Sequence, residues 1–409
     1  MVDKIDKHIL RNGMILLGEP MDAVGSVAFS FMLPAGAAIL ASGCCGASNV
    51  IADWISRGAA GKSSKELCDA LDGLGLHRAS CVGSSHITVG AVLEAGNLHR
   101  ALDLYGEIIC SPNLEQDQFE LAQHLAIDSV RALDDDPHQR VMLKLKEQFY
   151  PYPLGRSTLG SVEELQRLTA KRAKKIIQSY FDLSQTIFTV AGKYNFDEVC
   201  RQINSLFDLR QQGGFETPVT QAGPGRYTHI NNDGAQVHIG LMTETVKPND
   251  KSYYDARVAV SILSGGMSAR LFTEVREKRG LCYAIGAGYH CLKQAAGIMC
   301  YAGTTPDKAQ ETIKVIIGQF NHLCEGINEE EINRAKAGLK SALILQSEST
   351  SSRAGAIGSD YYMLGRVRSL DEIKDSIEET TVDSVRQFLA NNKFNDFTVV
   401  TVGPKQIDI

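Results

Sequence analysis

Arg276 and Tyr283 are the two residues whose types and spacing most readily suggest chemistry. They stand seven positions apart in the stretch from Gly265 to Ala284, which reads GGMSARLFTEVREKRGLCYA. The pattern predicts a helix that ends at Gly280 and a strand that begins directly after it. Arg276 would lie in the last helical turn and Tyr283 on the strand, so the two side chains could converge on one point. The alternative is a solvated helix arginine and a packed strand tyrosine without a function.

The elements that must position this pair are a turn, a capped helix and a strand. Gly265-Gly266 predicts the turn, and Ser268 is suited to the N-cap of the helix that follows. The helix would bury three apolar side chains, those of Leu271, Phe272 and Val275. Glu274 and Lys278, four positions apart, would form an ion pair on its solvated side.

The stretch resembles a signature in the C-terminal half of the insulinase (M16) zinc peptidases, which is a glycine-rich turn followed by Arg-Glu-x-x-Gly-Leu-x-Tyr. That resemblance implies that Arg276 and Tyr283 bind the substrate peptide and help to stabilise the tetrahedral oxyanion. It also implies an α+β fold of two duplicated α/β-roll domains, the LuxS/MPP-like metallohydrolase fold. Each domain of that fold is a mainly antiparallel sheet with helices packed on one face.

The family's other signature is H-x-x-E-H on a helix, in which two histidines bind zinc and the glutamate activates the metal-bound water. A distant glutamate is the third protein ligand. The matching segment here is 46–58, and Asn49, Ala52 and Asp53 stand at the positions of His, Glu and His. The position of the distant glutamate aligns with Ser129.

These replacements remove the zinc chemistry that the resemblance would otherwise imply. Asparagine and serine are poor zinc ligands, and alanine cannot act as a base. Shifting the alignment by one residue would bring Asp128 to the third position, but two carboxylates without a histidine do not make a tight zinc site. Apart from Asp53, nothing in 46–58 can take a proton near pH 7. We therefore expect this chain alone to bind no zinc and to hydrolyse no peptide by the family's mechanism.

The strand expected at 76–82 contains two further candidates. His77 and Cys81 would share a face of the strand, but His86 lies beyond a turn with reversed parity, so structural thiols are favoured over a metal site. In the family the corresponding strand is an exposed edge that pairs with substrate, usually through an Asn-Ala pair. Here the pair is Arg78-Ala79. A peptide could still add through main-chain hydrogen bonds, or the arginine could protect the edge from aggregation.

The domain organisation is suggested by one segment of linker composition. Residues 211–225 are rich in Gly, Pro, Gln and Thr and contain no run of three apolar residues. They predict a linker between an N-terminal domain at 1–210, which would carry the degenerate zinc site, and a C-terminal domain at 226–409, which would carry the Arg/Tyr motif.

The two halves repeat the order of their elements. Residues 169–194 and 381–404 each predict an amphipathic helix followed by a strand. Residues 26–36 and 235–245 each predict an opening strand. Because several pairs of segments occur in the same order at similar offsets, we infer an internal duplication.

The composition narrows the class of protein and its surroundings. The formal net charge of -6, from 42 Lys and Arg against 48 Asp and Glu, gives no basic field that would attract nucleic acid or anionic membrane. No segment approaches the ~20 apolar residues of a membrane helix. The ten cysteines are scattered without a CxxC pair, so we expect reduced thiols and a cytoplasmic location.

Taken together, the resemblance implies a non-catalytic, substrate-binding subunit of a heteromeric M16 zinc metallopeptidase. A partner subunit would carry H-x-x-E-H and the zinc, and this chain would hold no cofactor itself while it contributes Arg276 and Tyr283 to the binding of a peptide substrate. Two alternatives remain open. One is a structural or scaffold protein of the same fold, like the core subunits of respiratory complexes, and the other is a peptide-binding chamber without a peptidase role.

Overall fold

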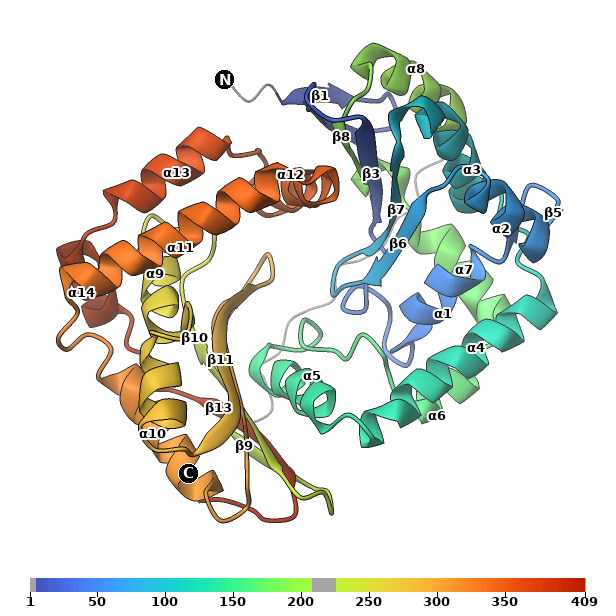
Figure 1. Ribbon diagram of the computed structural model, residues 1–409. Coiled ribbons are helices and arrows are strands. Elements are labelled where there is room, and N and C mark those ends of the chain that lie inside the picture. The colour runs from blue at the N-terminus through green and yellow to red at the C-terminus, as the bar shows by residue number, and fades with distance from the viewer. Residues whose placement is uncertain (1–4, 208–225, 409) are drawn as a thin grey trace. The chain divides into compact units, whose positions relative to one another are not determined.

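The computed structural model describes residues 5–207 and 226–408, which form two compact units (Figure 1). Unit 1 consists of residues up to 132 together with 156–207 and 346–368. Unit 2 consists of 133–155, 226–345 and the residues from 369 onward. The linker expected at 211–225 lies outside the described residues.

Unit 1 is built on a six-stranded sheet with the order β1-β2-β8-β3-β7-β6. All neighbours are antiparallel except β2 and β8, which are parallel. Its strands are β1 (Asp6–Ile9), β2 (Ile15–Pro20), β3 (Ser26–Leu33), β6 (His77–Val82), β7 (Ile87–Glu94) and β8 (Ile187–Gly192), and a separate hairpin is formed by β4 (Gly58–Ala59) and β5 (Lys62–Ser63). The aromatic rings of Phe29, Phe31 and Phe188 pack together on the core face of β3 and β8.

Unit 2 repeats this topology with five strands in the order β11-β12-β10-β13-β9. Its strands are β9 (Tyr227–Asn231), β10 (Val237–Glu244), β11 (Cys282–Cys291), β12 (Ala296–Thr304) and β13 (Thr398–Gly403). Its only parallel pair in the described residues is β9 with β13, which corresponds to β2 with β8 in unit 1. The order β9-β13-β10-β12-β11 therefore matches β2-β8-β3-β7-β6 strand for strand, as expected for a duplicated fold.

Helices cover one face of each sheet and share a core with it. In unit 1 these are α1 (Ala47–Trp54), α2 (Ser64–Asp72), α3 (Leu98–Cys110), α4 (Gln116–Arg131), α6 (Val162–Arg167), α7 (Ala170–Tyr180) and α8 (Phe196–Phe207). In unit 2 they are α9 (Tyr253–Ser264), α10 (Ala309–Asn321), α11 (Glu329–Ser347), α13 (Leu370–Glu379) and α14 (Val382–Asn391). The expected α+β class, with mainly antiparallel sheets, is confirmed. No helix of the described residues is long and apolar enough to cross a membrane.

The local signals in the sequence account for many of these boundaries. Ser63 accepts a hydrogen bond from the Glu66 backbone N–H at the start of α2, and the Glu66 carboxylate accepts one from Ser63 in return. This reciprocal pair satisfies two backbone donors that the first turn leaves open. The strand expected at 76–82 is β6.

Each sheet also carries one helix on its opposite face, and that helix comes from the other half of the sequence. Helix α12 (Thr350–Leu364) packs on β8, β3 and β2 of unit 1, and α5 (Pro137–Phe149) packs on β10 and β13 of unit 2. Small residues allow the close approach. A Cβ added at Gly358 would lie only 2.9 Å from the Met32 sulfur, and one at Gly240 would lie 3.2 Å from Leu145. Each half of the sequence thus contributes one helix to the sheet of the other half, and the two helices occupy equivalent places.

A buried ion pair fixes α12 to the sheet of unit 1. The Arg353 guanidinium on α12 donates to both carboxylate oxygens of Glu19 on β2, with N–O distances of 2.6 to 2.9 Å, and the two side chains are only 5% and 8% exposed. A guanidinium or carboxylate that is buried without its partner loses its hydration and gains no interaction in return, so its burial destabilises the fold. The ion pair therefore favours the one placement of α12 on β2 in which Arg353 meets Glu19.

We predict that Glu19→Gln or Arg353→Met alone lowers the free energy of unfolding of unit 1 by about 3–5 kcal/mol, because each leaves one charge buried and unpaired. The double variant Glu19→Leu/Arg353→Met should recover most of that loss. Trp54 is the chain's single tryptophan and lies buried in unit 1, so denaturant titration followed by tryptophan fluorescence reports this unit. Equal losses in the single and double variants would show that the charge pair is not the source of the stability.

The C-terminal end of α5 is anchored on unit 2 by a histidine. The Tyr150 hydroxyl lies 2.7 Å from Nδ1 of His290 on β11, and the pKa of His290 is lowered to about 4, chiefly because burial disfavours the imidazolium and secondly because of the Lys146 charge. The unfolded chain binds a proton at His290 below about pH 6.5, whereas the folded chain does not until about pH 4. Protonation therefore favours unfolding within this interval.

We predict that the free energy of unfolding of unit 2 falls by about 2 kcal/mol between pH 7.5 and pH 5 through His290 alone. His290→Gln should remove this part of the pH dependence while other titrations continue. The check is the difference between wild type and variant in denaturant titrations followed by far-ultraviolet circular dichroism at both pH values. Parallel curves for the two proteins would contradict the assignment.

Candidate functional site

Arg276 lies in a wide helical turn rather than in the α-helix that the sequence predicts. Residues Phe272–Glu277 form a π-helix, η4, in which the Lys278 backbone N–H donates to the Thr273 carbonyl oxygen at 2.9 Å. Ser268 does not cap it, because the helical segment begins later and no side-chain cap bond is formed. Wide turns of this kind are rare and frequently lie at functional sites. As predicted, Gly280 ends the segment with a left-handed φ of 57°.

The wide turn places Arg276 on the surface with a defined side-chain position. Its guanidinium lies 4.8 Å from the ring centroid of Phe272, four residues earlier on the same turn. The residue is exposed and forms no ion pair with a carboxylate of the described residues. Stacking on the ring leaves the edge of the guanidinium, with its N–H groups, free to bind a ligand.

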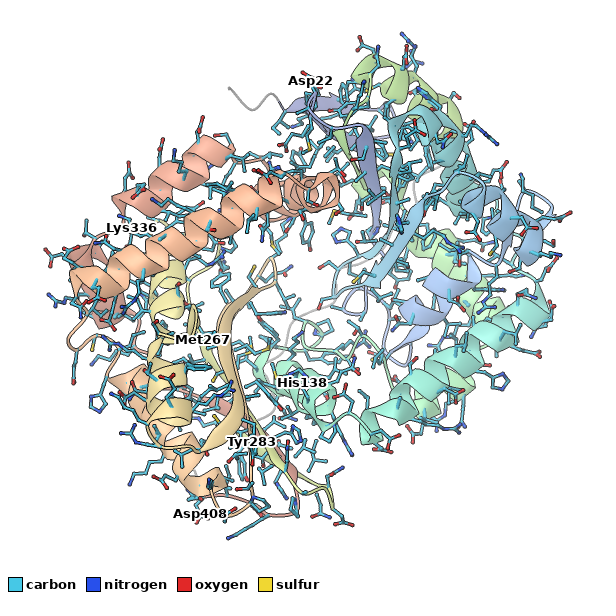
Figure 2. All side chains as sticks on the ribbon, in the orientation of Figure 1. Asp22, His138, Met267, Tyr283, Lys336 and Asp408 are labelled. Carbon is cyan, nitrogen blue, oxygen red and sulfur yellow. The ribbon has the colours of Figure 1, made fainter. Side chains whose placement is uncertain are left out.

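Tyr283 lies at the start of β11, the edge strand that follows η4, and it is 71% exposed (Figure 2). Its hydroxyl has no hydrogen-bond partner among the described residues. The interpretation as a packed strand tyrosine is therefore wrong, since the ring is largely in solvent. η4 and β11 pack against each other, so Arg276 and Tyr283 come from contacting elements.

Two charged groups stabilise the turn around this pair. Glu274 forms ion pairs with Lys278, as predicted, and with Arg279, and the hydrogen bonds from these two cations lower the pKa of Glu274. Arg270 donates to both oxygens of Glu331 on α11 at 2.7 and 2.9 Å. Burial alone would raise the pKa of Glu331, but the hydrogen bond and charge of Arg270 lower it.

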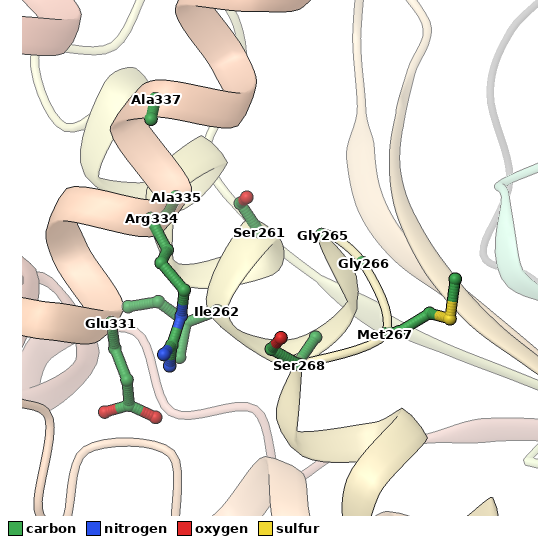
Figure 3. Close-up of a pocket in the computed structure, with 11 residues that line it drawn as sticks. Ser261, Ile262, Gly265, Gly266, Met267, Ser268, Glu331, Arg334, Ala335 and Ala337 are labelled. Carbon is green, nitrogen blue, oxygen red and sulfur yellow. The ribbon is translucent and has the colours of Figure 1, made fainter.

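A cavity of about 270 Å³ lies beside the glycine turn that leads into η4 (Figure 3). It lies between the end of α9 with the following turn and the side chains of Glu331 and Arg334 on α11. Gly265 must be a glycine here, because a Cβ would lie 2.5 Å from the Ser261 carbonyl oxygen. The glycines of the motif thus allow the tight turn that sets the start of the Arg276 segment.

Helix α1 holds the positions at which the family's zinc motif would lie, and their side chains have structural partners. The Asn49 amide donates to the Thr158 carbonyl oxygen, and the Asp53 carboxylate binds Arg57 at 2.7 Å. Ala52 is buried and offers no donor atom. Asn49 and Asp53 do share a face of α1, but neither provides an imidazole.

Ser129 lies on α4, which packs against α1 through the contact of Trp54 with Phe119. Its hydroxyl donates to the Leu125 carbonyl oxygen of its own helix at 2.8 Å, and the neighbouring Asp128 pairs with Arg131. No group of three or more His, Cys, Asp or Glu side chains in the described parts of the chain could hold a metal ion. The side chains at the zinc positions do not fit a zinc ion.

Strand β6 is the edge of the unit 1 sheet, and five of its six residues are exposed. It pairs with β7 on one side only among the described strands. Arg78 extends from it toward Asp72 and the Cys68 sulfur on α2. The edge therefore presents main-chain donors and acceptors to solvent, as strand addition requires.

Comparison with known proteins shows what the chain resembles. A sequence profile described as "Peptidase M16 inactive domain" matches residues 167–339. Over 401 residues the chain is 26% identical to an uncharacterised zinc protease of Rickettsia felis, with 97% of each chain covered. It is 22% identical over 408 residues to an uncharacterised zinc protease of Bacillus subtilis, with 98% of each covered. The chain is therefore similar to M16 peptidases and to their inactive domain.

Solved structures show that the M16 fold extends over the whole chain. A crystal structure of a peptidase M16 inactive domain from Pseudomonas fluorescens is similar with a TM-score of 0.88 at 18% identity, covering 99% of both chains. A chain of Complex III2 from Candida albicans is similar with a TM-score of 0.84 at 19% identity, covering 98% of this chain and 96% of that one. At these identities the likeness shows the fold.

Sequence reasoning missed two features of this chain that shape the candidate site. The π-helix was not foreseen, because the stretch 268–280 also fits an α-helical hydrophobic period. Phe272 was expected in the core, but it is only partly buried and supports the Arg276 guanidinium. The aromatic residue four positions before the arginine was the signal that could have indicated this stack.

We predict that the purified chain contains far less than one zinc per molecule, because the positions that align with the zinc motif offer one carboxylate and no imidazole. The measurement is elemental analysis after dialysis against zinc and then against buffer. The quadruple variant Asn49→His/Ala52→Glu/Asp53→His/Ser129→Glu is the matched positive control and should retain zinc. Stoichiometric zinc in the wild type would contradict the loss of the site.

Proposed function

We propose that this chain is the non-catalytic, substrate-binding subunit of a heteromeric M16 zinc metallopeptidase. It supplies Arg276 and Tyr283, while a partner subunit that carries H-x-x-E-H holds the zinc and the water that the metal polarises. The match to the M16 inactive-domain profile and the residues at positions 49, 52, 53 and 129 support the coarser part of this proposal, an M16-like chain without a functional zinc motif.

The observation that carries the proposal is the exposure of Tyr283. A large aromatic side chain that is 71% exposed on an edge strand gains little from burial, so stability does not explain why a tyrosine stands there. Arg276, from the contacting turn, likewise has no ionic partner in the described chain. Two free hydrogen-bond donors on adjoining elements suit the recognition of a ligand from solvent.

The chemistry of the two groups suits a peptide undergoing attack at its carbonyl carbon. The guanidinium and the phenol both donate hydrogen bonds to carbonyl oxygens. As negative charge develops on the carbonyl oxygen, a donor aimed at it binds the transition state more strongly than the substrate. Because the Arg276 guanidinium already packs on the Phe272 ring, its side chain loses less conformational freedom when it binds a ligand.

Strand β6 supports a role in peptide binding independently of this pair. Its exposed edge can accept an extended peptide through main-chain hydrogen bonds, with little dependence on the side chains of the peptide. Arg78 is held by Asp72 and need not block the edge. The strand therefore offers a peptide-binding surface within unit 1.

We predict that Arg276→Ala and Tyr283→Phe each lower the turnover of the complex by about 10²- to 10³-fold, the usual effect of removing one donor to an oxyanion. The complex is purified through a tag on this chain from its native cells, and peptide hydrolysis is measured with and without a chelator. Arg226→Ala, which removes an exposed arginine of unit 2 that pairs with Asp396 and does not line the cavity, is the matched control and should leave turnover unchanged. Assembly should be the same in all four proteins by size-exclusion chromatography.

Unchanged turnover in both variants, or the absence of any H-x-x-E-H protein from the complex, would reject the proposal. The second candidate is a structural scaffold, and the likeness of fold to a chain of Complex III2 favours it. A scaffold would be indifferent to Arg276→Ala and Tyr283→Phe but would copurify in a stable assembly. The same experiment therefore separates the two functions.

A further inference from the structure

Helix α7 of unit 1, with the last residue of α6 before it, concentrates positive charge that is not paired with a carboxylate of the described chain. Five cationic side chains of α6 and α7 are exposed and form no ion pair with any carboxylate of the described residues. We call them the basic face, and they are Arg167, Lys171, Arg172, Lys174 and Lys175. Some cations on other helices are paired, such as Arg334 with Glu330 and Lys340 with Glu378.

The fold itself gains nothing from this arrangement of charges. Helix α7 buries Ala173, Ile176 and Ile177 on its inner side, so the lysines project from the opposite side. Lys171 lies three and four positions before Lys174 and Lys175, and like charges at these spacings repel. Lys171 also lies in the first turn, where the helix dipole favours an anion and disfavours a cation.

The side chains at the border of the basic face are fixed to the segment around α1. Lys174 Nζ lies 5.8 Å from the centroid of the Trp54 ring, and Arg172 donates to the Ser42 carbonyl oxygen. Both contacts use neutral groups and leave the positive charges uncompensated. Neighbouring residues thus hold Lys174 and Arg172 in place, but no carboxylate of the described chain forms an ion pair with the cations of the basic face.

We propose that the basic face is a docking surface for an acidic segment of another polypeptide. A run of Glu or Asp side chains would relieve the repulsion between the lysines and would be favoured by the first turn of α7. The surface is a single helix of eleven residues, which suits a short acidic segment. The inference does not depend on the roles of Arg276 and Tyr283, because it rests on unit 1 alone.

Two other anionic partners are less well matched by what surrounds the cations. Single-stranded nucleic acid is bound with aromatic side chains that stack on bases, but Trp54 beside Lys174 is only 1% exposed. A membrane surface is bound by cations flanked by apolar side chains that insert, but the apolar side chains of α7 are buried in the core.

The test is the binding of a fluorescently labelled poly-glutamate peptide to the full chain, followed by fluorescence anisotropy at low and at physiological salt. Lys171→Gln/Lys174→Gln/Lys175→Gln should weaken binding about tenfold, because three favourable charge contacts are lost. The matched control is Lys65→Gln/Lys251→Gln/Lys393→Gln, which removes the same charge from exposed, unpaired lysines elsewhere and should change affinity less than about twofold.

The triple variant of the basic face should be folded and at least as stable as wild type, since it removes repulsion and only one ring contact. Circular dichroism and thermal unfolding establish this, so a loss of binding cannot be attributed to unfolding. Equal losses in the two triple variants, or no binding of poly-glutamate by wild type at low salt, would overturn the proposal. Binding of phosphatidylserine vesicles or single-stranded DNA that poly-glutamate does not displace would also overturn it.

Discussion

The buried ion pair between Glu19 and Arg353 joins residues 334 positions apart in the sequence and determines how the chain is divided into units. A guanidinium on α12 can be buried only where a carboxylate meets it, and β2 provides that carboxylate. The C-terminal half therefore must contribute a helix to the sheet of the N-terminal half. With α5 exchanged in the opposite direction, neither compact unit is formed by one half of the sequence alone. The duplicated halves are consequently interdependent in folding.

The arrangement of strands and helices in unit 2 also determines how far Arg276 and Tyr283 are exposed. Once α5 covers one face of the unit 2 sheet, the other face is covered by helices such as α9, α10 and α14, and β11 is left as the edge strand. An edge strand exposes one side of its backbone and the side chains at its end. Tyr283 is exposed for this reason, and the adjoining wide turn of η4 carries Arg276 to the same strand. The topology, more than any local preference, makes these two residues available to a ligand.

The sequence predicted the features that depend on local chemistry and missed those that depend on distant partners. The strand expected at 76–82 is β6, and Gly280 ends the segment that carries Arg276, as its sequence predicted. The segment 350–364 shows little contrast between an apolar and a polar face, and nothing in it indicates the sheet against which it packs, so the exchange of α12 could not be foreseen. An arginine among small residues at 353 was a signal, but its partner lies in the other half of the chain. The wide turn of η4 differs from an α-helix by one residue in its hydrogen-bond register, which hydrophobic periodicity does not resolve.

The two family motifs have also diverged in a physically consistent way. At the zinc positions the side chains are engaged within unit 1, since Asp53 binds Arg57 and Asn49 binds the Thr158 carbonyl oxygen. Only the Asn49 contact joins α1 to a distant segment, because Arg57 lies four residues after Asp53. At the Arg/Tyr positions the side chains are exposed, and a phenol in solvent adds little to stability. A structural role therefore accounts for the present residues of the first motif but not for Tyr283 in the second. A requirement that arises outside this chain, in a ligand or a partner, is the kind of constraint that the exposed tyrosine fits.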